Sequence, residues 1–107
     1  MEYVGNILYD QKLMDTSKKF VIFGAGIYGR RILKYMDLNG VKGSIICFCD
    51  SNTQIGGQYI EEIPVRQVKD VVSQYPDAEY LIAGKYTKEM YQILIQSSVR
   101  KIHILFV

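Results

Sequence analysis

The sequence has few cysteines, no long hydrophobic run and almost no net charge. Its two cysteines, Cys47 and Cys49, lie too close together in one apolar run to form a stabilising disulfide, and a second pair that would complete a zinc site is missing. We therefore predict two buried free thiols and no metal site. The apolar runs are far shorter than the roughly 20 residues that span a membrane, so we predict no membrane span.

The first residues lack the basic start and apolar core of a secretory signal peptide, so we expect a cytoplasmic protein. Thirteen basic and eleven acidic residues leave a net charge of +2, which is too small to indicate a nucleic-acid partner. Residues 1–35 nevertheless hold six Lys and Arg against three Asp and Glu, a local excess of +3. This excess surrounds a glycine-rich segment and favours an anionic ligand there.

A chain of 107 residues is the size of one domain. Short apolar runs alternate with segments whose apolar residues have helical spacing, which predicts a parallel sheet covered by helices on both faces. Pro64 limits its run to a short edge strand. Right-handed crossovers then give a three-layer, doubly wound α/β domain with strand order 3-2-1-4-5. The predicted strands are residues 19–23, 44–49, 63–65, 80–83 and 102–107.

We place the domain boundary near residue 17. Before it, Val4, Ile7 and Leu8 have weakly amphipathic spacing, so residues 1–17 are predicted to form an extra N-terminal helix that packs on the sheet or on a partner. Residues 18–107 form the predicted nucleotide-binding domain.

The strongest motif is a G-x-G-x-x-G segment that directly follows the first predicted strand and opens a helix. Gly24 permits the tight turn, Gly26 lacks the Cβ that would keep a phosphate away, and Gly29 lets the helix approach the sheet. Asp50 follows 21 residues after Gly29, at the end of the second strand, where a carboxylate accepts hydrogen bonds from ribose hydroxyls. The predicted ligand is therefore a nucleotide, and Asp50 favours NAD over NADP.

Other residues are expected at the same crevice because ligands of such sheets bind outside the carboxyl ends of the strands. Lys85 follows the fourth strand, where it would reach a phosphate or a sugar, whereas Arg30 is more typical of a surface charge. His103 lies within the last strand without an acidic or nucleophilic neighbour in sequence, which indicates a core or edge histidine. The predicted binding residues are Gly24, Ala25, Gly26, Ile27, Tyr28, Gly29, Asp50, Ser51, Gly84 and Lys85. No catalytic residue is recognisable.

Five segments together resemble a known family: residues 23–30, 48–52, 55–57, 63–65 and 81–84. The chain, over roughly residues 18–107, is similar to the Rossmann-like N-terminal nucleotide-sugar-binding domain of bacterial sugar O-acyltransferases of the sialic-acid type and of related polysaccharide-biosynthesis proteins. The resemblance implies that Gly24, Gly26, Gly29 and Asp50 bind a nucleotide sugar or a dinucleotide. The acyltransferases carry their catalytic histidine on a following β-helix, which these 107 residues do not include.

The main hypothesis is a module that binds NAD or a UDP-type sugar for a bacterial surface-polysaccharide enzyme and has no catalysis of its own. One alternative is a subunit of an NAD-dependent sugar-nucleotide oxidoreductase, epimerase or dehydratase whose catalytic residues come from a partner. Another is a dimerisation or docking domain that binds no nucleotide. In each case we expect a homodimer or docking to a catalytic domain.

Overall fold

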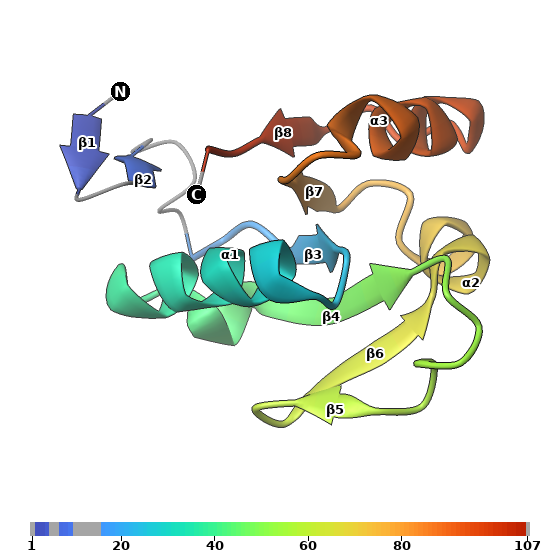
Figure 1. Ribbon diagram of the computed structural model, residues 1–107, viewed down its shortest axis with the longest axis horizontal. Coiled ribbons are helices and arrows are strands. Elements are labelled where there is room, and N and C mark those ends of the chain that lie inside the picture. The colour runs from blue at the N-terminus through green and yellow to red at the C-terminus, as the bar shows by residue number, and fades with distance from the viewer. Residues whose placement is uncertain (1, 5–6, 10–15, 107) are drawn as a thin grey trace.

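A computed structural model describes residues 2–4, 7–9 and 16–106 of the chain, with side chains from residue 16 onward. A two-stranded sheet and a six-stranded sheet are present in this part of the chain (Figure 1). The elements are β1 (Glu2–Val4), β2 (Ile7–Tyr9), β3 (Phe20–Phe23), α1 (Ile27–Leu38), the 3-10 helix η2 (Lys42–Ser44), β4 (Ile45–Asp50), β5 (Tyr59–Ile60), β6 (Ile63–Gln67), α2 (Val68–Gln74), β7 (Glu79–Ile82), α3 (Thr87–Gln96) and β8 (Ile102–Ile104).

The main sheet has the order β5-β6-β4-β3-β7-β8. The strands β6, β4, β3, β7 and β8 are parallel. Each of them corresponds to a run predicted as a strand. The sheet differs from the predicted order 3-2-1-4-5 because a sixth strand, β5, pairs antiparallel with β6 and forms the edge. The sheet is therefore mixed and not purely parallel.

The prediction that Pro64 lies on an edge strand is wrong, because Pro64 lies inside the sheet. Its strand, β6, is flanked by β4 and β5. The register explains how proline is accommodated, because pairing with β4 begins at Val65, which is opposite Phe48. On the other side Val65 donates its N–H to the carbonyl of Gln58 (2.8 Å). The missing N–H of Pro64 thus falls just outside the β4 ladder.

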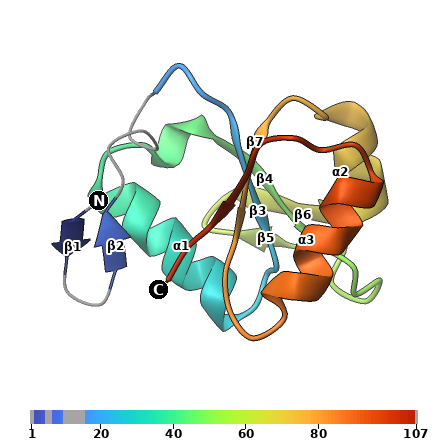
Figure 2. The same ribbon diagram turned by 90° about the horizontal axis from the view of Figure 1, so that it is seen from above.

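The helices form two outer layers. Figure 2 shows α1 on one side of the sheet and α2 and α3 on the other. Two separate clusters of buried side chains match these layers: Ile32 and Met36 of α1 belong to one, and Val71 of α2 and Leu94 of α3 belong to the other. Within the part of the chain that the structure describes, no helix is both long and apolar enough to cross a membrane.

The predicted N-terminal helix is wrong where the structure can be compared with it. Residues 2–4 and 7–9 are the antiparallel strands β1 and β2, with Val4 opposite Ile7. The remainder of the predicted helix, residues 1, 5–6 and 10–15, lies outside the described residues. The sequence also contains a pattern typical of a hairpin: a Gly-Asn dipeptide separates two runs rich in β-branched and aromatic residues. The same apolar residues have amphipathic spacing, which led to the prediction of a helix.

Cys47 and Cys49 are buried free thiols, as predicted. Because they are two residues apart on β4, they point to the same face of the sheet, where they pack in the cluster beneath α2 and α3.

The turn between β5 and β6 holds two glutamates in a backbone conformation that favours glycine. Glu61 has a φ of +49° and Glu62 a φ of +72°. A two-residue hairpin turn with positive φ at both positions is of type I′, for which Asn-Gly is the preferred pair. Lys42 Nζ contacts Glu61 Oε1 at 2.9 Å, but an exposed ion pair of this kind contributes little.

We expect the double substitution Glu61→Asn and Glu62→Gly to stabilise the protein, by about 1–2 kcal/mol, because left-handed backbone costs a residue with a Cβ about 1 kcal/mol or more. Urea denaturation at neutral pH measures this difference. The single substitution Glu61→Gln, which keeps the backbone conformation and weakens the Lys42 contact, is the control. A double variant no more stable than the control would contradict the explanation.

Candidate functional site

The glycine loop is held against the end of β4. Gly24 has a φ of +102° and donates its N–H to the carbonyl of Cys49 over 2.7 Å. Gly29, in the first turn of α1, packs directly on Gly24: a Cβ at Gly29 would overlap the carbonyl oxygen of Gly24 and lie 2.9 Å from its carbonyl carbon. Glycine is therefore required at both positions by the fold itself.

Gly26 differs from these two glycines. Its φ of −89° and ψ of −153° are extended backbone that any residue adopts, and a Cβ built there would meet no atom within 4 Å. Neither backbone strain nor packing therefore requires glycine here, although glycine is a favoured N-cap residue. The missing Cβ leaves room for a ligand to approach the backbone closely.

Gly26 is also the N-cap of α1. Arg30 donates its N–H to the Gly26 carbonyl over 3.0 Å, while no side chain of the described residues caps the helix and no acidic residue stands in its first turn. The first N–H groups of a helix have no acceptor within the helix, and the helix dipole makes this end positive. An anion at this end would satisfy both features.

Asp50 ends β4 beside the loop. Its Oδ2 accepts the N–H of Ala25 (2.9 Å), and its Oδ1 accepts the N–H of Asn52 (2.8 Å). These bonds give Asp50 a structural role, because they tie the glycine loop to the turn after β4. Each carboxylate oxygen has two lone pairs, so both retain the capacity to accept a further hydrogen bond from a ligand hydroxyl.

Tyr28 and Gly84 bring the loop after β7 against α1. Gly84 has a φ of +104°, and a Cβ there would lie 2.7 Å from Cδ2 of Tyr28, so the ring occupies the space that a larger residue would need. The guanidinium carbon of Arg31 lies 5.3 Å from the centre of the same ring, a cation–π distance. This contact was not predicted from the sequence.

A crevice of about 400 Å³ opens between these elements, within the size range of small-ligand sites. Eight of the ten predicted binding residues line it: Gly24, Gly26, Ile27, Tyr28, Gly29, Asp50, Ser51 and Lys85. The other two lie next to it. Ala25 is buried behind the loop and bonds Asp50, and Gly84 lines a smaller neighbouring cavity with Tyr28. Arg30, predicted as a surface charge, is exposed and does not line the crevice.

Sequence reasoning missed the wall that α3 contributes to the crevice. Tyr86, Glu89, Met90 and Ile93 line it, at positions i, i+3, i+4 and i+7 of one helical face. Two exposed apolar side chains line the crevice: Ile27 and Tyr86 are among the most exposed large apolar groups in the described part of the chain, at 69% and 68%. The spacing in the sequence places these residues on one helical face but does not indicate what that face contacts.

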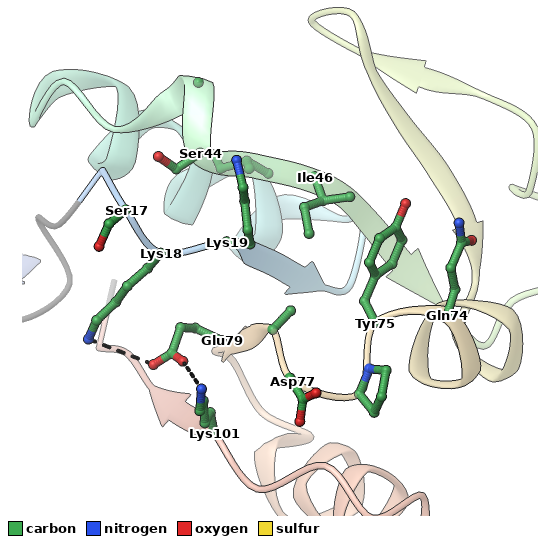
Figure 3. A pocket seen from close by; sticks show the side chains of 14 residues that line it. Ser17, Lys18, Lys19, Ser44, Ile46, Gln74, Tyr75, Asp77, Glu79 and Lys101 are labelled. Carbon is green, nitrogen blue, oxygen red and sulfur yellow. Dashed lines mark ion pairs between the residues drawn. The ribbon is translucent and has the colours of Figure 1, made fainter.

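A larger cavity, about 720 Å³, lies at the opposite end of the sheet, where the strands begin (Figure 3). Its main charged feature is Glu79, which is only 8% exposed and faces Lys18 (3.8 Å) and Lys101 (3.7 Å). His103 Nε2 lies 3.0 Å from Glu79 Oε1. These contacts hold β8 to the sheet and pair the charges internally. The crevice at the carboxyl ends of the strands is therefore the stronger candidate for ligand binding.

The described residues include no group of three or more His, Cys, Asp or Glu side chains arranged to hold a metal ion.

No protein-family model and no curated protein matches the chain. Solved structures do match it, among them three of RSP, a Rex-family repressor: one of RSP, one of RSP in complex with beta-NADH, and one of RSP in complex with beta-NAD+ and operator DNA. Their TM-scores are 0.61, 0.60 and 0.62 at 19% identity, and they cover 88%, 81% and 87% of this chain. The chain in turn covers 48%, 44% and 46% of the repressor chains, slightly less than half their length.

At this identity the likeness shows the fold, which is Rossmann-like. The comparisons give no support to the resemblance to sugar O-acyltransferases. They also overturn the exclusion of a nucleic-acid partner, because a protein that contains this fold has been solved on operator DNA. The exclusion rested on the small net charge of one domain, and that charge carries no information about what a longer protein contacts with its remaining parts.

Proposed function

We propose that this chain is an NAD-binding Rossmann-like module. The observation that carries the proposal is Gly26: it stands at the positive end of α1 with open space where its Cβ would be, so a bound group can approach the backbone closely there. A pyrophosphate is the group that fits, because it accepts hydrogen bonds from the N–H groups of the first helical turn.

The remaining parts of the crevice agree with a nucleotide. Asp50 would accept hydrogen bonds from ribose hydroxyls, and its negative charge would oppose the 2′-phosphate that distinguishes NADP. Exposed Lys85 supplies a cation at the edge of the crevice. The fold likeness to a repressor solved with NADH and with NAD+ supports the dinucleotide over other anions.

Titration calorimetry with NAD+, NADH and NADP+ tests the proposal. We expect the unmodified chain to bind both NAD forms and to bind NADP+ more weakly. Gly26→Ala should weaken NAD binding at least about tenfold, equivalent to about 1.4 kcal/mol, without lowering the melting temperature. The new methyl group occupies space that the protein leaves open, so it affects the ligand and not the fold.

Gly43→Ala is the matched control, because a Cβ there also meets nothing within 4 Å and the residue lies away from the crevice. Its affinity for NAD should equal that of the unmodified chain. If neither NAD form binds at millimolar concentration, the proposal is wrong. If NAD binds equally well to Gly26→Ala, the glycine loop is not the phosphate site.

A further inference from the structure

The α3 wall of the crevice is apolar except for one group. Met90 and Ile93 are partly buried and belong to the hydrophobic cluster beneath α3. The terminal methyl carbon of Met90 reaches to 3.2 Å from the position of a Cβ on Gly24, so this face of α3 extends across to the glycine loop. Glu89 lies on the same face, and its exposed carboxylate makes no ion pair or hydrogen bond with any residue from 16 to 106.

A free carboxylate is unexpected in a crevice whose other features favour an anion. Glu89 stands in the first turn of α3, where an acidic residue interacts favourably with the helix dipole. The helix dipole explains why an acidic residue is favourable at this position of α3. It does not offset the electrostatic repulsion between this carboxylate and phosphates bound in the same crevice. A carboxylate only accepts hydrogen bonds, so a ligand donor at this wall would offset that cost.

The chemistry of the groups that line the crevice indicates which donor this is. The helix end at Gly26 suits the phosphates and Asp50 suits the ribose, which leaves the slot beside Met90 and Ile93 for the base. Flat apolar walls with few polar groups are typical of such sites. Adenine, guanine and cytosine each carry an amino group that donates hydrogen bonds, whereas uracil presents two carbonyl acceptors on either side of its single ring N–H.

We propose that Glu89 accepts a hydrogen bond from the amino group of the base and so selects nucleotides whose base carries one, adenine foremost, against uridine nucleotides. This inference rests on the proposed nucleotide function and deepens it. It separates the two ligands that the sequence left open, because NAD contains adenine and UDP-type sugars contain uracil. The carboxylate repels the uracil carbonyls and attracts the adenine amine.

The test compares three diphosphates: ADP, UDP, and the diphosphate of purine riboside, which differs from ADP only by lacking the amino group. We expect the unmodified chain to prefer ADP over both of the others by about tenfold or more, the effect of one hydrogen bond to a charged group. In Glu89→Gln the ADP preference should fall to about threefold or less, and UDP should bind more tightly, because an amide also donates to a uracil carbonyl.

Lys88→Gln is the control, since it also changes one charge at an exposed position of α3 but does not line the crevice. Its base preference should remain that of the unmodified chain, whereas a general electrostatic role for Glu89 would shift all three affinities together. Equal affinities of the unmodified chain for ADP and purine riboside diphosphate would overturn this inference and leave the nucleotide site in place. Failure of all three to bind, with NAD also failing, would overturn the proposed function itself.

Discussion

Gly29→Ala should strongly destabilise the chain, whereas Gly43→Ala should change its free energy of unfolding by less than about 1 kcal/mol. The methyl group at position 29 would overlap the carbonyl oxygen of Gly24, and the side chain of Ile22 lies 3.5 Å away on β3. Backbone atoms cannot move aside as a flexible side chain does. The start of α1 would therefore have to separate from β3.

The expected cost is about 3 kcal/mol or more, at the upper end for added bulk in a packed interior, against a total stability of about 5–15 kcal/mol for a domain. Circular dichroism and urea denaturation of both variants measure it. A Gly29→Ala variant that melts within a few degrees of the unmodified chain would contradict this account, because it would mean that α1 and the loop can separate at little cost.

Together with Gly26→Ala, this variant separates two roles that are combined in one motif. Gly29 is required for packing and Gly26 is not required by the protein. A chain that kept its glycines only for packing would tolerate alanine at position 26 in every respect. The opposite outcomes expected at the two positions therefore distinguish a nucleotide site from a domain that merely shares the fold.

The parallel part of the sheet could be predicted from the sequence because each of its strands is a local apolar run. The runs around Ile22, Phe48 and Leu81 are buried on both faces and alternate with helices, and right-handed crossovers then leave few possible orders. The glycine loop and Asp50 could be predicted for the same reason, since their spacing within one βαβ unit is fixed by geometry.

Features that depend on contacts distant in sequence could not be predicted. The partner of His103 is Glu79, 24 residues earlier on the neighbouring strand, and no spacing rule joins them. β5 has only two residues, Tyr59 and Ile60, and exists because β6 offers it an edge. Glu89 could not be placed in the crevice before the position of α3 over the sheet was known.

Raising the pH from 7 to 10 should destabilise the fold strongly through its buried thiols. Burial raises the pKa of Cys47 to about 11, although the nearby Arg66 lowers it somewhat. Burial also raises the pKa of Cys49, and the nearby Cys47 and Asp50 raise it further. Burial likewise raises the pKa of Tyr80, and the two cysteines raise it further. All three side chains belong to the cluster beneath α2 and α3.

Each of these groups is an acid that the native state keeps neutral. In the unfolded chain a thiol ionises near pH 8.5. Between that pH and the raised pKa of the native state, the unfolded state releases protons that the native state retains. The free energy of unfolding is therefore highest below pH 8.5 and falls as the pH rises. Cys47 alone should reduce the free energy of unfolding by about 1–2 kcal/mol at pH 10. Cys49 acts in the same direction, and Tyr80 does so at higher pH.

The hydroxyl of Tyr80 shows why the native state resists ionisation. It donates to the carbonyl of Tyr75 (2.9 Å) and lies 3.3 Å from that of Val71. A phenolate has no proton to donate and would face two carbonyl oxygens inside the core, which is a strongly unfavourable arrangement. Alkaline unfolding should therefore be cooperative, because opening the core releases all three groups at once.

Urea denaturation at pH 7 and pH 10 provides the measurement, with the Cys47→Ala and Cys49→Ala double variant as the matched comparison. The double variant should be less stable at pH 7, because it has lost two buried sulfur atoms, yet it should lose at least about 2 kcal/mol less between the two pH values. Deprotonation of surface lysines affects both chains equally and cancels in this difference. Equal losses in the two chains would show that the thiols titrate normally. Fast reaction of both cysteines of the unmodified chain with a thiol reagent, in the native state at pH 8, would show the same.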